Sequence, residues 1–280
     1  SKVIFQSSGS EANDTAVKLV HYYNNSIGRP EKKKIISRLK AYHGTTRTAA
    51  SLTGLPNMHK HFDLPLEGIL HTSTPHYYRN GAEGESEEDF ATRMAADLEQ
   101  MIVDAGPETV AAFIAEPVMG AGGVIVPPRT YFEKMQAVLK KYDVLMIADE
   151  VICGFGRTGN MWGCDTFNIQ PDILVCAKAL SSSYLPISAV LVADHVYQGI
   201  AEGTADGGPP FGHGYTYGGH PVSAAVAVET LKIYDEIDMV GHVQSISPLM
   251  QDGLRQFADH PMVGEVRGVG LVAAVEVVED

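Results

Sequence analysis

The 280-residue sequence lacks any apolar run that approaches the about 18 residues needed to span a membrane, and we expect no signal peptide. Cysteine is scarce: Cys153, Cys164 and Cys176 form no CxxC pair and have no histidines at zinc-finger spacing. Such a set suggests neither a disulfide framework nor a structural zinc site. His59 and His61 lack a third ligand at a useful spacing, so we expect no metal site. We expect a folded soluble protein of a reducing compartment, with the cytoplasm as the best fit.

Positive charge is also in short supply. The chain has 21 Lys and Arg against 34 Asp and Glu, which gives a formal net charge of -13 at pH 7. A surface this acidic repels phosphate backbones and anionic lipid headgroups. The composition therefore argues against nucleic-acid and membrane partners.

Short β-branched runs alternate with segments of helical periodicity along the chain. We expect buried strands at residues 3–6, 35–38, 110–115, 144–148, 172–176 and 188–192. Between them, residues 90–102, residues 131–141 and a segment with Ala12, Ala16 and Leu19 place apolar side chains on one helical face. This alternation predicts an α/β fold, in which helices cover both faces of a mostly parallel sheet.

The last third of the chain changes in character. Residues 201–219 are rich in glycine, and we expect them to form a long loop before helical periodicity returns at 221–233. A smaller unit follows, with a helix near 244–257 and strands at 264–267 and 271–278. We therefore assign residues 1–238 to a large domain and residues 239–280 to the beginning of a small domain. The chain starts and ends in strand-like segments, so we expect it to be truncated at both ends.

Polar side chains follow three of the predicted strands. Glu116 comes after the strand at 110–115, Asp149 after the strand at 144–148, and Lys178 soon after the strand at 172–176. Ligands of open parallel sheets bind at the carboxyl ends of the strands. We therefore expect these two acids and this lysine to lie in one site.

The lysine and one of the acids suit the chemistry of pyridoxal 5′-phosphate. A lysine directly after a buried strand is costly to keep charged and unpaired, and a partly desolvated neutral lysine forms a Schiff base with a carbonyl. An acid on the neighbouring strand, such as Asp149, can keep the pyridine nitrogen protonated. Lys178 could instead be a surface lysine and Asp149 a structural acid that caps a turn, so each assignment alone stays open.

Two further segments follow strand ends. Residues 7–10, Ser-Ser-Gly-Ser, precede the first predicted helix, where free N–H groups can bind a phosphate or simply belong to an ordinary helix cap. Tyr42-His43-Gly44 follows the second strand. There an aromatic ring can stack on a flat cofactor, or it can be an ordinary core or surface tyrosine.

In combination, these segments resemble the motifs of class III pyridoxal-phosphate aminotransferases, and most closely the pyruvate-dependent amine, or ω-, aminotransferases. The matching motifs are Ser8-Gly9-Ser10-Glu11-Ala12, Tyr42-His43-Gly44, Glu116-Pro117, Asp149-Glu150-Val151 with Gly154-Phe155-Gly156-Arg157 and Gly159, Ala177-Lys178, Tyr184-Leu185-Pro186, and His213-Gly214-Tyr215-Thr216-Tyr217 with Gly219-His220-Pro221. The similarity covers essentially the whole chain. It implies a fold-type I large domain and a homodimer whose active sites lie at the subunit interface.

The resemblance assigns roles around the cofactor. Lys178 would form the Schiff base, and Asp149, supported by His43, would pair with the pyridine nitrogen. Gly9 and Ser10 would hold the phosphate.

It also assigns roles to the walls of the site. Tyr42 would stack on one face of the ring and Val151 would pack against the other. Glu116 would orient the site, and Thr216 would reach the phosphate in the partner subunit. Tyr42 and Ala121 would line the substrate pocket.

We therefore expect an enzyme that uses pyridoxal 5′-phosphate to transfer an amino group from an amine or ω-amino donor to a keto acid such as pyruvate. Two alternatives stay open: another class III reaction, decarboxylation or amino-group migration, or a truncated chain that binds the cofactor without turnover. The sequence departs from the family's pattern near Lys178, because Ala179, Ser183 and Ser188 stand where glycine is usual. We expect the local backbone to differ there.

Overall fold

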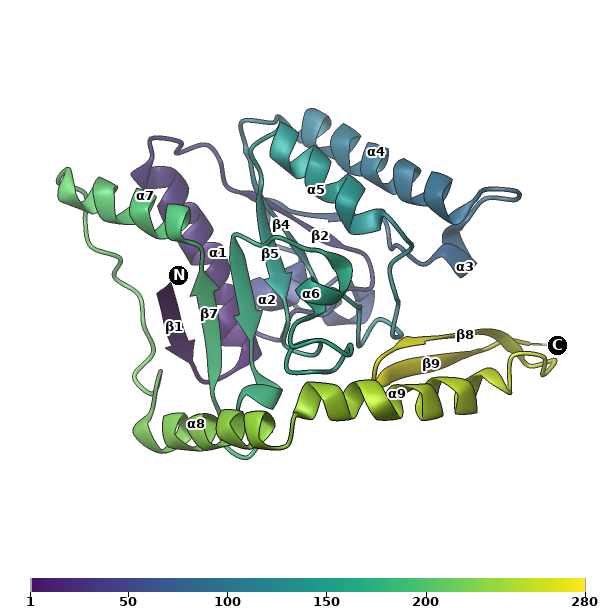
Figure 1. Ribbon diagram of the computed structural model, residues 1–280. Coiled ribbons are helices and arrows are strands. Elements are labelled where there is room, and N and C mark those ends of the chain that lie inside the picture. The colour runs from purple at the N-terminus through teal and green to yellow at the C-terminus, as the bar shows by residue number, and fades with distance from the viewer. Residues whose placement is uncertain (1, 280) are drawn as a thin grey trace.

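The computed structural model describes residues 2–279 and is built around one large twisted sheet (Figure 1). Its strands are β1 (Lys2–Gln6), β2 (Lys34–Arg38), β3 (Ile69–Thr72), β4 (Val110–Ala115), β5 (Leu145–Asp149), β6 (Ile173–Cys176) and β7 (Ser188–Val192). Their order in the sheet is β1-β7-β6-β5-β4-β2-β3. From β3 to β6 neighbouring strands run parallel, whereas β7 is antiparallel to both β6 and β1. The predicted α/β fold with a mostly parallel sheet is confirmed.

The register of the central strands brings their carboxyl ends to one edge. Ala115 lies opposite Ala148, and Asp149 lies opposite Val175. Glu116, which directly follows β4, is therefore close to the end of β5, and the residues after β6 emerge beside both. The sheet itself gathers the predicted polar side chains at this edge.

Helices cover both faces of the sheet, as predicted. On one face, α1 (Gly9–Ser26) and α2 (Arg47–Leu52) pack on inward side chains such as Ile35 and Ile147. On the other, α4 (Glu87–Ala105) and α5 (Tyr131–Lys141) cover Phe113 and Met146. In β5, Leu145 and Ile147 enter one core and Met146 and Ala148 enter the other, which is why this strand is apolar up to Asp149.

The helix α7 (Asp194–Ala205) corrects the predicted loop at 201–219, because the helix continues into the first part of that segment. Two glycines hid its periodicity. A Cβ on Gly199 would lie 2.6 Å from the ring of Tyr23, and a Cβ on Gly203 would lie 2.7 Å from Ser26. These glycines let α7 pack closely on α1. The remaining loop, residues 206–220, runs from α7 past β1 to the next helix (Figure 1).

The last part of the chain forms a long helical arm and a hairpin. The helices α8 (Pro221–Glu236) and α9 (Met239–Arg255) follow one another along one side of the molecule, and β8 (Val263–Val269) pairs with β9 (Val272–Val277) beside α9 (Figure 1). The hairpin rests on the loops that follow β4 and β5, through Arg267 and through a bond from Leu271 N to the Arg157 carbonyl. The predicted strands at 264–267 and 271–278 are confirmed in kind and place, whereas the division into two domains stays a prediction.

The short elements are α3 (Tyr77–Asn80), α6 (Gly163–Phe167) and the 3-10 turns at Pro56–Met58 and Lys178–Ser181. Within residues 2–279, no helix has both the length and the apolar character needed to cross a membrane.

Candidate active site

A cavity of about 510 Å³ opens at the carboxyl ends of β4, β5 and β6. Its lining includes eight of the residues predicted for the site: Gly9, Ser10, Tyr42, His43, Glu116, Asp149, Val151 and Lys178. They come from segments far apart in the sequence, and the sheet edge brings them together. The structure thus places these side chains around one cavity at this edge of the sheet.

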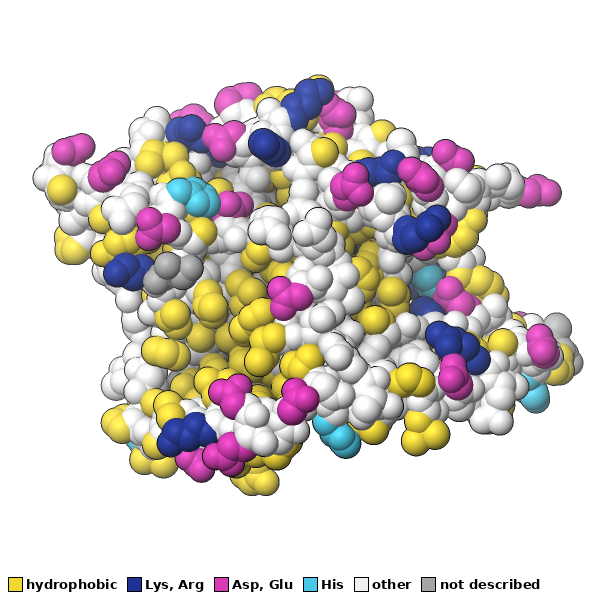
Figure 2. All heavy atoms as spheres, in the orientation of Figure 1, with side chains coloured by type: hydrophobic (Ala, Val, Ile, Leu, Met, Phe, Trp, Pro, Cys, Tyr) yellow, Lys and Arg dark blue, Asp and Glu magenta, His cyan; other side chains and the backbone are white. Residues whose placement is uncertain are grey.

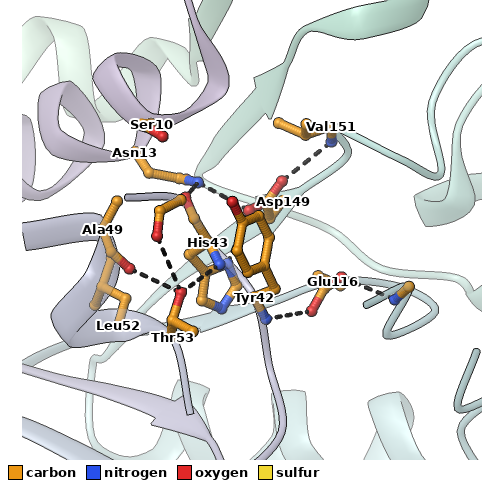
Figure 3. Close-up of polar contacts among 12 residues, drawn as sticks. Ser10, Asn13, Tyr42, His43, Ala49, Leu52, Thr53, Glu116, Asp149 and Val151 are labelled. Atoms are coloured by element: carbon orange, nitrogen blue, oxygen red, sulfur yellow. Dashed lines mark hydrogen bonds and ion pairs between the residues drawn. The ribbon is translucent and has the colours of Figure 1, made fainter. Parts of the chain in front are cut away.

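The Asp149 carboxylate lies at the buried end of the cavity and is held by three donors (Figure 3). Its Oδ1 accepts a hydrogen bond from the Val151 backbone N–H at 3.1 Å. Its Oδ2 accepts from the Asn13 Nδ2 at 2.8 Å and faces the His43 Nδ1 at 2.8 Å. Three donors thus fix the position of this buried carboxyl group.

The His43 ring fits the supporting role expected of it. It is fully enclosed, and its Nδ1 donates to Asp149 when Asp149 is ionised. Its backbone N–H donates to the Thr53 Oγ1 at 2.9 Å, which fixes the segment that carries the ring. The imidazole therefore has one orientation, with its N–H toward the acid.

Asn13 is a site residue that the sequence analysis missed. It lies on α1, is buried, and uses its Nδ2 for both the Asp149 carboxylate and the His43 carbonyl, the latter at 2.7 Å. It thus ties the first helix to the ends of two other segments. It directly follows the Ser8–Ala12 motif, but nothing in the local sequence distinguishes it from a polar residue that faces water.

Glu116 connects the strand β4 to the segment of Tyr42. Its Oε1 accepts from the Tyr42 backbone N–H at 3.0 Å, and its Oε2 accepts from the Gly120 N–H at 2.9 Å (Figure 3). The buried Arg38 donates from Nη2 to the Glu116 carbonyl at 2.6 Å. Burial raises the pKa of the Glu116 carboxyl above its ordinary value. The side chain therefore fixes the backbone beside the cavity, in keeping with the orienting role predicted for it.

The predicted phosphate turn is the start of α1. Ser8 is the N-cap, and its Oγ accepts from the Glu11 N–H at 3.2 Å. Gly9 and Ser10 then open the helix at the cavity, where backbone N–H groups and the helix dipole favour an anion. Ser188, one of the departures from the family's glycine pattern, donates from Oγ to the Ser8 carbonyl at 2.7 Å and so anchors this turn.

Lys178 begins the 3-10 turn after β6, and its side chain enters the cavity. The side chain is exposed there, which differs from the partial desolvation that the sequence analysis expected, because the cavity is open at this point. Within the described part of the chain, its amine makes no hydrogen bond or ion pair with another side chain. The backbone here is unusual: Lys178, Ser182 and Ser183 have φ of 41, 50 and 61 degrees. The lysine is thus held at the cavity by a backbone that few L-residues adopt.

Two predicted site residues do not line the cavity. Ala121 lies in the turn after β4, Thr216 lies in the loop before α8, and both side chains are exposed. The substrate-pocket role of Ala121 and the intersubunit role of Thr216 stay predictions. The part of the chain that the structure describes has no group of three His, Cys, Asp or Glu side chains placed to hold a metal ion.

The lining fits a flat ring that carries a phosphate. Gly9 is the test of this fit, because a Cβ at this position would lie 3.1 Å from the Val151 side chain and fill the space between the helix start and that wall. Tyr42 lines the cavity together with Val151. An acid for a ring nitrogen, a lysine for an aldehyde and a helix start for a phosphate thus surround one space.

The comparisons with known proteins agree with this chemistry. A family model for class-III aminotransferases matches residues 1–280. Gamma aminobutyrate transaminase 1, mitochondrial, of Solanum lycopersicum is 60% identical over 275 residues, which are 98% of this chain and 53% of that protein. Probable gamma-aminobutyrate transaminase 3, mitochondrial, of Oryza sativa is 58% identical over 279 residues, 100% of this chain and 54% of that protein. The chain spans about half the length of the curated relatives it matches.

Solved structures extend the likeness to three dimensions. The ω-transaminase of Pseudomonas jessenii in complex with PMP has a TM-score of 0.97 and 60% identity, and the match covers 99% of this chain and 61% of that one. A structure described as a transaminase with L-Ala has a TM-score of 0.97 and 62% identity, with 100% and 66% covered. The fold and the site therefore define a pyridoxal-phosphate-dependent transferase of fold type I. Within that class, the chain belongs to the class-III aminotransferase family, whose members use pyridoxal phosphate.

Proposed function

We propose that this chain carries the catalytic core of an aminotransferase that moves an amino group from an amine or ω-amino donor to a keto acid such as pyruvate. The observation that carries the proposal is the joint position of Asp149, Lys178 and the Gly9 turn on one cavity. The choice of an ω-amino donor is supported by the names of the relatives, which are γ-aminobutyrate transaminases and ω-transaminases.

In this proposal, pyridoxal 5′-phosphate supplies an electron sink for the carbon that loses its proton. Gly9 and Ser10 would bind its phosphate at the start of α1. Asp149, fixed by Asn13 and His43, would bind the pyridine nitrogen. Because its three donors are already in place, this carboxylate needs no rearrangement before it binds.

Lys178 would bind the cofactor covalently and later act as the base. Its Nζ, at the cavity, would take the proton from the substrate carbon that bears the amine and deliver it to the cofactor carbon that carried the aldehyde. The Tyr42 ring and Val151 would limit the position of that carbon by enclosing the site from two sides. Glu116 would hold the Tyr42 backbone during this step through its bond at 3.0 Å.

The proposal is tested by following alanine formation from pyruvate with γ-aminobutyrate and with 1-phenylethylamine as donors. Lys178→Ala and Asp149→Asn are expected to lower turnover by orders of magnitude, because one removes the base and the other removes the charge beside the ring nitrogen. Lys232→Ala is the matched control, since that lysine is exposed on α8 and, among residues 2–279, forms an ion pair with Glu229 alone. Full activity in either site variant would contradict the assignment, as would product formed by decarboxylation instead of transfer.

We also propose a homodimer in which Thr216 serves the partner's site. The support is the exposed position of Thr216 and the apolar surface that the monomer leaves open. Val3 and Phe5 on β1 and Val222 on α8 are each about half exposed, at 47%, 47% and 57%. Figure 2 shows hydrophobic side chains gathered in the hollow between α7 and α8. A monomer in size-exclusion chromatography that still binds the cofactor with full affinity would count against this assembly.

The location that we propose is the cytoplasm. The support is that Cys153, Cys164 and Cys176 are buried and free. Such cysteines fit a reducing compartment. Imaging of the tagged full-length protein in its own cells is the test, and an organellar signal would contradict the proposal.

A further inference from the structure

Arg267 reaches from the hairpin strand β8 into the turn that follows β4. Its Nε donates to the carbonyls of Gly123 at 3.0 Å and Val124 at 3.1 Å, and its Nη2 donates to the Gly123 carbonyl at 2.5 Å. The C-terminal hairpin thus binds a loop of the large sheet through one guanidinium group.

Two acids hold this guanidinium from the other side. Its Nη1 lies 2.8 Å from the Glu265 carboxylate and 2.7 Å from the Glu276 carboxylate. The His76 Nε2 faces Glu265 at 2.9 Å, and Arg79 contacts Glu276 at 2.8 Å. Because the Arg267 side chain is only 10% exposed and its planar fork is used on both edges, its position is fixed.

The turn that Arg267 binds needs such support. The N–H groups of Gly123 and Val124 both donate to the Gly120 carbonyl, and Met119 bridges to Ile125 across the turn. Val124 has a φ of 50 degrees, which is costly for a β-branched residue. A strained conformation of this kind persists only where its surroundings determine it.

The same turn supports the candidate active site. Its Gly120 N–H donates to the Glu116 Oε2 at 2.9 Å, and the Glu116 Oε1 accepts from the Tyr42 N–H at 3.0 Å. A Cβ on Gly122 would lie 2.3 Å from the Lys40 carbonyl, so the turn also packs tightly against the segment that leads to Tyr42. One continuous set of contacts therefore runs from the hairpin to the cavity wall.

We propose that Arg267 is a positioning residue: it holds the turn at 120–125 so that Glu116 and Tyr42 keep the geometry that the amine substrate requires. It touches neither the cavity nor the predicted cofactor groups. The part of this proposal that concerns catalysis rests on the proposed aminotransferase function. The part that concerns the turn does not.

The experiment uses the full-length protein and three variants. Arg267→Met removes every polar contact of the guanidinium, and Arg267→Lys keeps a charge for Glu265 and Glu276 but cannot reach both carbonyls as well. Arg79→Met is the matched control, because Arg79 binds the same Glu276 but not the turn. Amide hydrogen exchange is measured without substrate on peptides that cover residues 117–126 and 38–46, and KM and kcat are measured for the amine donor.

In Arg267→Met, the amide exchange rate at residues 117–126 is expected to rise about tenfold or more, because losing one hydrogen bond to a charged group changes an equilibrium constant by about that factor. KM for the amine is expected to rise about as much, with kcat changed less, since the turn acts on substrate position. The exchange rate and the KM of Arg267→Lys should lie between those of wild type and Arg267→Met. If the methionine variant does not fold, Arg267→Lys alone provides the test. Equal exchange in Arg267→Met and Arg79→Met would overturn the proposal, as would faster exchange with an unchanged KM. A wild-type protein that transfers no amino group would refute the proposed function, and the exchange data would still decide whether Arg267 holds the turn.

Discussion

Replacement of Asn13 by alanine separates the residue that fixes the Asp149 carboxylate from an ordinary buried asparagine. Asn13 donates to the Asp149 Oδ2 at 2.8 Å and to the His43 carbonyl at 2.7 Å. A hydrogen bond to a charged group contributes about 1.5–3 kcal/mol and a neutral one about 0.5–1.5 kcal/mol. We therefore expect Asn13→Ala to lower the free energy of unfolding by about 2–4 kcal/mol.

The same helix offers a matched control. Asn24 is on α1, is buried to the same extent, and makes one local bond from Nδ2 to the Val20 carbonyl at 2.9 Å. Asn24→Ala makes the same chemical change and gains the same helix propensity. Its free energy of unfolding should therefore fall by only about 0.5–1.5 kcal/mol. Urea denaturation measures both losses, and titration with pyridoxal 5′-phosphate measures cofactor affinity. Only Asn13→Ala should weaken cofactor binding, because only this change removes a hydrogen bond that fixes Asp149. Equal effects of the two variants on stability and on affinity would refute this account of the site.

Two further predictions concern acidity and backbone strain. Because burial raises the pKa of Glu116, its protonated form stabilises the fold below the ordinary pKa of 4.5, and this contribution is lost as pH rises toward the higher folded-state pKa. Above pH 4.5, the free energy of unfolding of wild type relative to Glu116→Gln should therefore fall as pH rises, by at most about 1.4 kcal/mol per pH unit. Denaturation curves at several pH values measure this difference, and a flat or rising difference would contradict the prediction. Ser183→Gly should raise the free energy of unfolding by about 0.5–1 kcal/mol, because φ is 61 degrees at this position and glycine adopts this conformation without strain. Ser183→Ala should not raise it. A loss of stability in the glycine variant would show that the left-handed conformation is not strained.

Much of the fold could be predicted from local patterns. The strands at 110–115 and 188–192 and the helix at 131–141 have the bounds that their periodicity indicates. The direction of a strand leaves no trace in its own residues, however, so the antiparallel pairing of β7 and β1 could not be predicted. The second half of the helix α7 could not be predicted, because its glycines allow close packing against α1 but have low helix propensity.

The site was predictable to a similar degree and for a physical reason. Glu116, Asp149 and Lys178 could be found because polar side chains at the ends of apolar runs are conspicuous. Asn13 could not, because a polar residue in an amphipathic helix usually faces water, and only the tertiary structure shows that this one faces Asp149. The exposure of Lys178 likewise depends on the shape of the cavity, which no local pattern encodes.

The pairing of β1 with β7 has a consequence for the order in which the chain acquires its structure. Lys2 lies opposite Val192, and Ser8 is bonded by Ser188 across a separation of 180 residues. During synthesis, the start of α1 must wait for these distant residues before its anchor forms. Contacts of such long range slow folding, because the entropy of closing the intervening chain is lost before the pairing is gained. We infer that the parallel strands from β3 to β6 are assembled first and that the end of the cavity at the start of α1 is completed last.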